Sequence, residues 1–213
     1  IERLRAELDE AAGLTAEART QAAEQFAKAI ERLESTAQLT TQIATLKAEA
    51  DRAPQELARL EKLATTQPEQ QPIPAETEPL RAAHREAEAA AAEARRKVSA
   101  LTAEIERRTV RGRDLPELAT QARSRLETIA ESLAAPSLAG EPPELVAARR
   151  LWLECARQYR TAELDSLEQE TRTYAETARV LALERERAER TVTESGRRLA
   201  ALVREVADRD QQE

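Results

Sequence analysis

The sequence predicts an all-α fold: an elongated antiparallel helical hairpin, or coiled coil, with an additional N-terminal helix packed alongside. Charged residues make up 34% of the 213 residues and aromatic residues only 2%, too few to anchor a compact core. Glycine is scarce, whereas Ala, Glu, Arg, Leu and Gln, which favour helix, dominate. Between clusters of proline, apolar residues recur every three and four positions, as they do on one face of a helix.

Residues 1–64 are expected to form an N-terminal helical region with a break near Pro54. Proline lacks an amide hydrogen, and its ring clashes with the preceding turn of a helix. We therefore expect the helix to end at about Ala50, the break to lie at residues 51–54, and a short Leu-rich continuation to run from Pro54 to Leu63. The apolar face becomes regular from Phe26 onward, at Phe26, Ile30, Leu33, Ala37, Ile43 and Leu46.

Residues 65–78 are expected to form a Pro-rich linker, because Pro68, Pro72 and Pro74 are incompatible with a helix and favour extended chain. Thr77, followed by Pro79 in a first turn, is typical of the start of the next helix. Residues 79–213 are then expected to form a long antiparallel helical hairpin.

The turn of this hairpin is expected at 135–143, where Pro136, Gly140, Pro142 and Pro143 end one helix and start the next. A connection this short places its flanking helices side by side and antiparallel. The first arm carries a heptad seam at Leu80, His84, Ala87, Ala91, Ala94, Val98, Leu101 and Ile105.

Each arm also contains an irregularity. In the first arm, the stretch from Gly112 to Pro116 predicts a kink or short break. In the second arm the seam shifts phase near Leu164 and then includes polar residues, among them Thr171, Arg185 and Ser195, which would fix the register.

The residues needed for chemistry are missing, so we predict no catalytic, cofactor-binding or metal-binding residue. One histidine and one cysteine cannot form a zinc site, which takes about four such ligands. The glycines, at positions 13, 112, 140 and 196, are too scattered to form a phosphate-binding loop. We therefore expect a protein that is not an enzyme, has no cofactor and has no small-molecule substrate.

Several single residues allow two interpretations. Cys155 is either a buried apolar helix position or a reactive thiol, and His84 is either a half-buried seam residue or a pH sensor. Trp152, Tyr159 and Tyr174 are either bulky contacts of the seam or residues that stack on a ligand.

Two surface patches are also open to two interpretations. Arg107, Arg108, Arg111 and Arg113 are either solvated flank charge or a contact for acidic lipid or a partner subunit. Leu138, at the tip of the turn, either belongs to the turn alone or docks into a partner.

Charge and hydropathy exclude other classes. The formal net charge is −7 with acidic and basic residues interleaved, so the chain lacks the basic stripe that nucleic acid requires. No apolar run in the sequence approaches the roughly 20 residues that span a bilayer. The chain starts at Ile1 and contains no methionine, so we expect it to be a portion of a longer protein.

Several segments resemble a known family. They are AIERLESTAQLTTQIATLKAEADRAPQELARL (29–60), DLPEL (114–118), ARSRLETI (122–129), AARRL (147–151) and LDSLEQE (164–170). Together they resemble the N-terminal periplasmic coiled-coil domain of large MscS-type mechanosensitive channels, the MscK-like group, over about residues 26–207.

The resemblance implies an inner-membrane channel that releases solutes after hypo-osmotic shock, with this chain as its periplasmic portion. The pore would lie outside this sequence. The implied partners are the rest of the channel polypeptide, neighbouring subunits and components of the cell envelope. The alternative is a coiled-coil scaffold or the arm of a chromosome-organising ATPase, which shares the Ala/Glu/Arg composition. Flanking sequence discriminates, because an ATPase carries a Gly-rich phosphate loop and a channel carries membrane spans.

Overall fold

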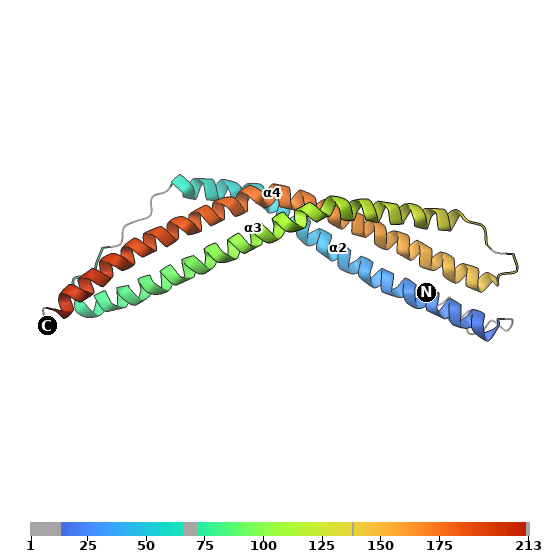
Figure 1. The fold of residues 1–213 in the computed structure, drawn as a ribbon, viewed down its shortest axis with the longest axis horizontal. Coiled ribbons are helices and arrows are strands. Elements are labelled where there is room, and N and C mark those ends of the chain that lie inside the picture. Colours follow the sequence, from blue (N-terminus) through green and yellow to red (C-terminus); the bar gives the residue numbers. More distant parts are fainter. Residues whose placement is uncertain (1–13, 66–71, 138, 212–213) are drawn as a thin grey trace. The chain divides into compact units, whose positions relative to one another are not determined.

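Three helices make up most of the chain. The computed structural model describes residues 14–65, 72–137 and 139–211. Its helices are α2 (Ala16–Thr65), α3 (Thr77–Ala134) and α4 (Pro143–Asp210), drawn in Figure 1. Helix accounts for 92% of the described residues, and no strand occurs among them. The predicted all-α class is therefore confirmed.

The helix ends follow local signals in the sequence. The amide of Ala18 donates to the Thr15 hydroxyl oxygen at 3.2 Å, so Thr15 caps the start of α2. Thr77 begins α3, as the sequence predicts. Pro143 begins α4, in the first-turn position where a missing amide costs nothing. Gly140, in the connection between α3 and α4, has a φ of 81°, which glycine adopts without strain.

No break occurs at either internal proline, so the predicted break near Pro54 is wrong, and of the kink or short break predicted at Gly112–Pro116 the short break does not occur. α2 runs through Pro54, and α3 runs through Gly112 and Pro116. The fixed φ of proline suits a helix, although its missing amide removes one backbone hydrogen bond. Neighbouring side chains are packed, since Ala53 is 4% and Leu115 is 1% exposed. This packing, together with helix-favouring flanks, outweighs the local cost.

Some predicted features lie outside the described residues. They are the first 13 residues, the centre of the 65–78 linker at 66–71, and Leu138 at the tip of the turn. Residues 72–76 of the predicted linker are not helical, whereas Thr65 belongs to α2 and Thr77 and Glu78 belong to α3, so the linker is shorter at both ends than the sequence predicts.

The chain divides into two compact units, each containing a segment of every helix. Unit 1 comprises Ile1–Glu49 and Gly112–Thr173. Its core joins α2 to α4 through Phe26, which is 2% exposed, and Ala148. The other members of this cluster are Ala22, Leu14, Ala23, Leu145 and Leu151.

Polar contacts define the register of unit 1. The Arg32 guanidinium lies 4.8 Å from the centre of the Tyr159 ring. The Thr173 hydroxyl lies 3.1 Å from the Leu46 carbonyl oxygen, across 127 residues, and 2.8 Å from the Gln169 carbonyl oxygen of its own helix, so the two carbonyls share its one hydrogen. Both contacts have the same separation in sequence, so α2 and α4 run parallel in unit 1.

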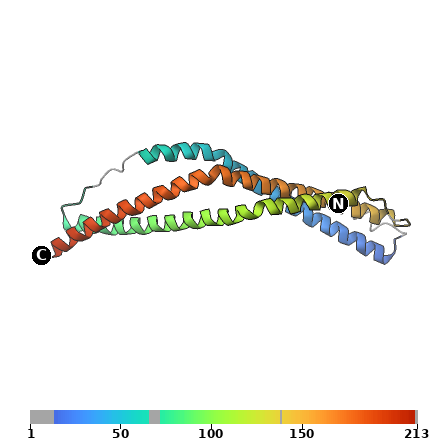
Figure 2. The same ribbon diagram turned by 45° about the horizontal axis from the view of Figure 1, so that its top comes forward.

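Unit 2 comprises Ala50–Arg111 and Tyr174–Glu213. Its apolar cluster joins α3 and α4 through Leu80, Ala83, Ala87 and Leu202, with Leu199 and Val206 packed against it. Arg81 pairs with Asp210 at 2.9 Å, whereas Arg108 further along α3 donates to Thr177 earlier in α4. α3 and α4 therefore run in opposite directions in this unit, as Figures 1 and 2 also show.

The buried apolar positions are mostly alanine. The heptad seam predicted for the start of α3 is confirmed at Leu80, Ala87, Ala91 and Ala94, all of them buried. In α2 the predicted face holds at Phe26 but fails at Leu33, which is 38% exposed, and at Ala37, which is also exposed. The buried residues around Phe26 are the small Ala22 and Ala29 instead. Small seam residues allow two helix backbones to approach closely.

Candidate functional site

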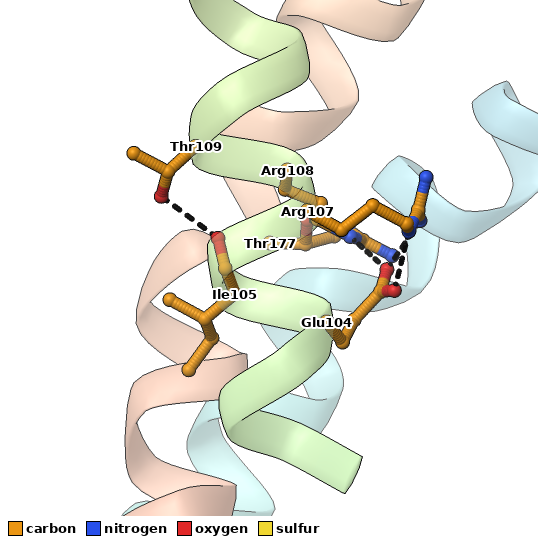
Figure 3. A network of polar contacts seen from close by, with 6 residues as sticks. All are labelled: Glu104, Ile105, Arg107, Arg108, Thr109 and Thr177. Carbon is orange, nitrogen blue, oxygen red and sulfur yellow. Dashed lines mark hydrogen bonds and ion pairs between the residues drawn. The ribbon is translucent and has the colours of Figure 1, made fainter.

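A network of polar contacts lies between α3 and α4 of unit 2 (Figure 3). α3 places Glu104, Arg107 and Arg108 on one face through spacings of three and four residues. Arg107 donates to both Glu104 carboxylate oxygens, Nη2 to Oε1 at 2.6 Å and Nε to Oε2 at 2.8 Å. The Nε of Arg108 donates to the same Oε1 at 2.5 Å. One carboxylate therefore holds two guanidinium groups.

Arg108 carries this cluster across to α4. Its Nη1 donates to the Thr177 hydroxyl oxygen at 2.8 Å, and its guanidinium carbon lies 5.1 Å from the centre of the Tyr174 ring. We call Glu104, Arg107, Arg108, Tyr174 and Thr177 the Glu104 network. Figure 3 shows Thr109 apart from it, with its hydroxyl donating to the Ile105 carbonyl at 2.7 Å within α3.

The electrostatics of the network favour its charged forms. Hydrogen bonding from Arg107 is the main cause that lowers the pKa of the Glu104 carboxyl from 4.5 to about 2, and Arg108 adds to it. The same pairing raises the pKa of the Arg107 guanidinium. The ion pairs of the network therefore lie within α3, and Arg108 joins them to α4 through the Thr177 hydroxyl and the Tyr174 ring.

A row of buried polar side chains follows one face of α4. Ser166, Glu170, Thr173 and Thr177 are between 0% and 6% exposed and are spaced by four, three and four residues. The sequence places Thr171 in the seam, which is wrong because Thr171 is exposed and its hydroxyl donates to the Leu167 carbonyl. Thr173 takes the seam position, and its hydroxyl bonds to α2.

Tyr159 lies between two arginines in unit 1. The guanidinium carbons of Arg32, from α2, and Arg160, from α4, lie 4.8 and 4.9 Å from the centre of its ring. Arg160 also pairs with Glu163 at 2.7 Å. The sequence predicts Tyr159 to be a bulky contact of the hairpin seam, but its described contacts are with two cations, Arg32 of α2 and Arg160 of α4.

The remaining residues singled out from the sequence occupy ordinary helical positions. Cys155 is 4% exposed, and burial raises the pKa of its thiol, so the buried interpretation is confirmed. His84 is half-buried on α3, as expected for a seam residue. Trp152 and Tyr174 are also half-buried. The contacts described here do not join any two of these four residues.

The four arginines at 107, 108, 111 and 113 differ in their interaction partners. Arg107 and Arg108 belong to the Glu104 network, and Arg111 also has an interaction partner. Arg113 is exposed. The four side chains therefore do not form one shared surface of unpaired positive charge.

Neither a metal centre nor a membrane span is found in the part of the chain that the structure describes. Across residues 14–65, 72–137 and 139–211, no three or more His, Cys, Asp or Glu side chains are grouped so that they could hold a metal ion. Within the same residues, no helix combines the length and apolar character needed to traverse a bilayer.

Comparison with known proteins finds no relative of this chain: no family model matches it, and no curated protein or solved structure matches it either. The contacts described above are therefore the physical basis for a functional proposal, together with the resemblance in the sequence.

Proposed function

We propose that this chain is a non-catalytic, periplasmic helical domain of a large MscS-like mechanosensitive channel, with a structural or modulatory role in solute release after osmotic shock. The resemblance assigns the chain to a channel, and the observation that supports a structural role is the Glu104 network, in which Arg108, paired with Glu104 within α3, also donates to Thr177 of α4. Groups held in this way stabilise a helix pair and are not free to react with a substrate.

The proposed arrangement is an elongated antiparallel hairpin of α3 and α4, with the N-terminal helix alongside. Contacts within each unit support it. Arg123 pairs with Glu168 at 2.8 Å in unit 1, and Arg81 pairs with Asp210 at 2.9 Å in unit 2. Small-angle scattering tests this arrangement. A radius of gyration of about 17 Å, the value for a compact domain of this length, would contradict the elongated arrangement.

The proposed partners are the rest of the channel polypeptide, neighbouring subunits and components of the cell envelope. Nucleic acid is not among them, because the net charge is −7 and the arginines of the patch are engaged within the chain or separated. The resemblance over residues 26–207 is what assigns the chain to a channel.

The first test is the sequence that flanks this chain in its parent protein. The proposal expects membrane-spanning helices after the C-terminal end. A Gly-rich phosphate loop in the flanks would support the alternative, the arm of a chromosome-organising ATPase, which the α3–α4 contacts fit equally well.

The second test is electrophysiological. Deleting this region from the full-length channel is expected to change the tension threshold or the gating kinetics in patch-clamp recordings, at matched amounts of channel in the membrane. Threshold and kinetics that both stay unchanged would overturn the proposed role.

A further inference from the structure

Two backbone carbonyls in the middle of α2 and α3 lack their normal helical donor. In an α-helix the carbonyl of residue i accepts a hydrogen bond from the amide of residue i+4. Pro54 and Pro116 lie inside helices and have no amide hydrogen. The carbonyls of Ala50 and Gly112 therefore have no i+4 donor, and each helix loses one rung of its hydrogen-bond ladder.

These two carbonyls coincide with the limits of the compact units. The α2 segment of unit 2 starts at Ala50, and the α3 segment of unit 1 starts at Gly112. The coincidence is independent of the prolines, because the limits follow from which parts of the chain pack together.

Gly112 also weakens α3 at this place, and no steric contact requires a glycine there. A Cβ at this position would meet nothing within 4 Å, and among the described glycines only Gly140 has a positive φ. Neither close packing nor backbone conformation therefore requires glycine at position 112. A glycine inside a helix costs about 1 kcal/mol relative to alanine.

Each weak point lies about one turn beyond a contact that its own helix makes with α4. Leu46, one turn before Ala50, accepts a hydrogen bond from Thr173 in unit 1. Arg108, one turn before Gly112, donates to Thr177 in unit 2. In contrast to α2 and α3, α4 has no internal proline from Pro143 to Asp210.

This stretch of α4 also has little apolar burial to stiffen its neighbours. Between Leu167 and Leu183, its buried residues are Glu170, Thr173 and Thr177. A hydrogen bond contributes about 1 kcal/mol net, whereas a fully buried leucine contributes about 1.5–3 kcal/mol. The missing backbone hydrogen bonds of α2 and α3 therefore occur close to the part of the α4 seam that is polar.

We infer that α2 and α3 each contain a built-in bending point, at Ala50–Pro54 and at Gly112–Pro116, whereas α4, which has no internal proline, contains none. The inference concerns the backbone of the helices and holds whether or not the chain belongs to a channel.

Hydrogen exchange measured by mass spectrometry on the full chain tests this inference. Amides within four residues of Pro54 and of Pro116 should exchange at least tenfold faster than those of α4 at 173–180. Pro54→Ala should slow exchange about tenfold in α2 only, and Pro116→Ala should do so in α3 only. Pro143→Ala is the matched control, because it replaces a proline at a helix start and should change neither stretch.

Exchange near both prolines that equals exchange at 173–180, or that does not respond to the alanine variants, would overturn the inference. A second measurement uses spin labels at positions 34 and 61 of α2, with Cys155 replaced by alanine. Pulsed electron paramagnetic resonance should give a distribution of distances between the two labels that is narrower in Pro54→Ala than in the parent chain and unchanged in Pro143→Ala. A distribution in the parent chain as narrow as in Pro54→Ala would contradict a bending point in α2.

Discussion

Replacing Phe26 with alanine should destabilise unit 1 by about 3 kcal/mol. Removing a fully buried phenylalanine side chain typically costs about 3–5 kcal/mol, because burial is lost and a cavity is left. Phe26 is 2% exposed, and its buried neighbours Ala22 and Ala148 are too short to fill the space. Leu145 and Leu151 are only partly buried and can shift inward, which places the expected cost at the lower end of the range.

Urea denaturation measures this loss. Trp152 is the single tryptophan and lies on α4 in unit 1, so its fluorescence reports on the unit that contains Phe26. The midpoint should fall while the slope of free energy against urea stays the same, because the surface exposed on unfolding hardly changes. Circular dichroism at 222 nm follows all three helices in the same experiment.

Leu33→Ala is the matched control. The apolar spacing of the sequence predicts Leu33 to be as buried as Phe26, but Leu33 is 38% exposed. Its truncation should therefore cost less than about 1 kcal/mol, as surface substitutions do. Equal losses for the two variants, or a loss below about 1 kcal/mol for Phe26→Ala, would refute the packing of α2 against α4 described here.

Three further predictions concern charge and reactivity. The lowered pKa of Glu104 means that its ion pairs stabilise the fold above about pH 4.5, and that this contribution is lost as the pH falls toward 2. Solvent reaches the pair, so Glu104→Gln should cost about 1 kcal/mol at pH 7 and remove that part of the acid sensitivity in urea unfolding at pH 7 and pH 3. A double-mutant cycle of Arg32→Met and Tyr159→Leu should give a coupling of about 0.5–1 kcal/mol. The buried Cys155 thiol, with its raised pKa, should react with Ellman's reagent at least about 100-fold more slowly in the folded chain than in urea.

Each of these has a definite contrary outcome. The same acid sensitivity in Glu104→Gln as in the parent chain would show that Glu104 does not titrate in its ion-paired form. A coupling energy of zero would mean that Arg32 and Tyr159 contribute independently of one another. Rapid labelling of Cys155 without denaturant would place this thiol at the surface.

The sequence predicts helices well where packing is simple and less well where it is not. In α3, Ala87, Ala91 and Ala94 lie on a regular heptad, and all are buried because small side chains fit any close helix contact. In α2, Ser35, Thr36, Thr40, Thr41 and Thr45 donate their hydroxyls to carbonyls one turn back. The hydroxyls of such residues form their hydrogen bonds within α2, and the apolar residues between them recur with only a weak helical periodicity. The phase of the α2 face is therefore poorly determined by sequence.

The local half of the Glu104 network could also be read from sequence, because acidic and basic residues three and four apart pair on a helix. The other half could not. Arg108 and Thr177 are separated by 69 residues, and matching them requires the register of two antiparallel helices to within one turn. An error of two residues in the predicted phase selected Thr171 where the structure buries Thr173.

The alanine seam explains why this register has to be set by polar groups. Because alanines are alike and small, sliding one helix past another by a turn exchanges one alanine for another at little cost. Leucine or phenylalanine would resist such a slip, but few of them are buried. A slip of one turn along α4 would instead place Leu181 opposite Arg108, leaving a mostly buried guanidinium without the hydroxyl of Thr177. The hydrogen bond from Arg108 to Thr177 contributes only about 1 kcal/mol to stability, yet its loss would leave a mostly buried guanidinium without that acceptor, and this penalty disfavours the slipped alignment.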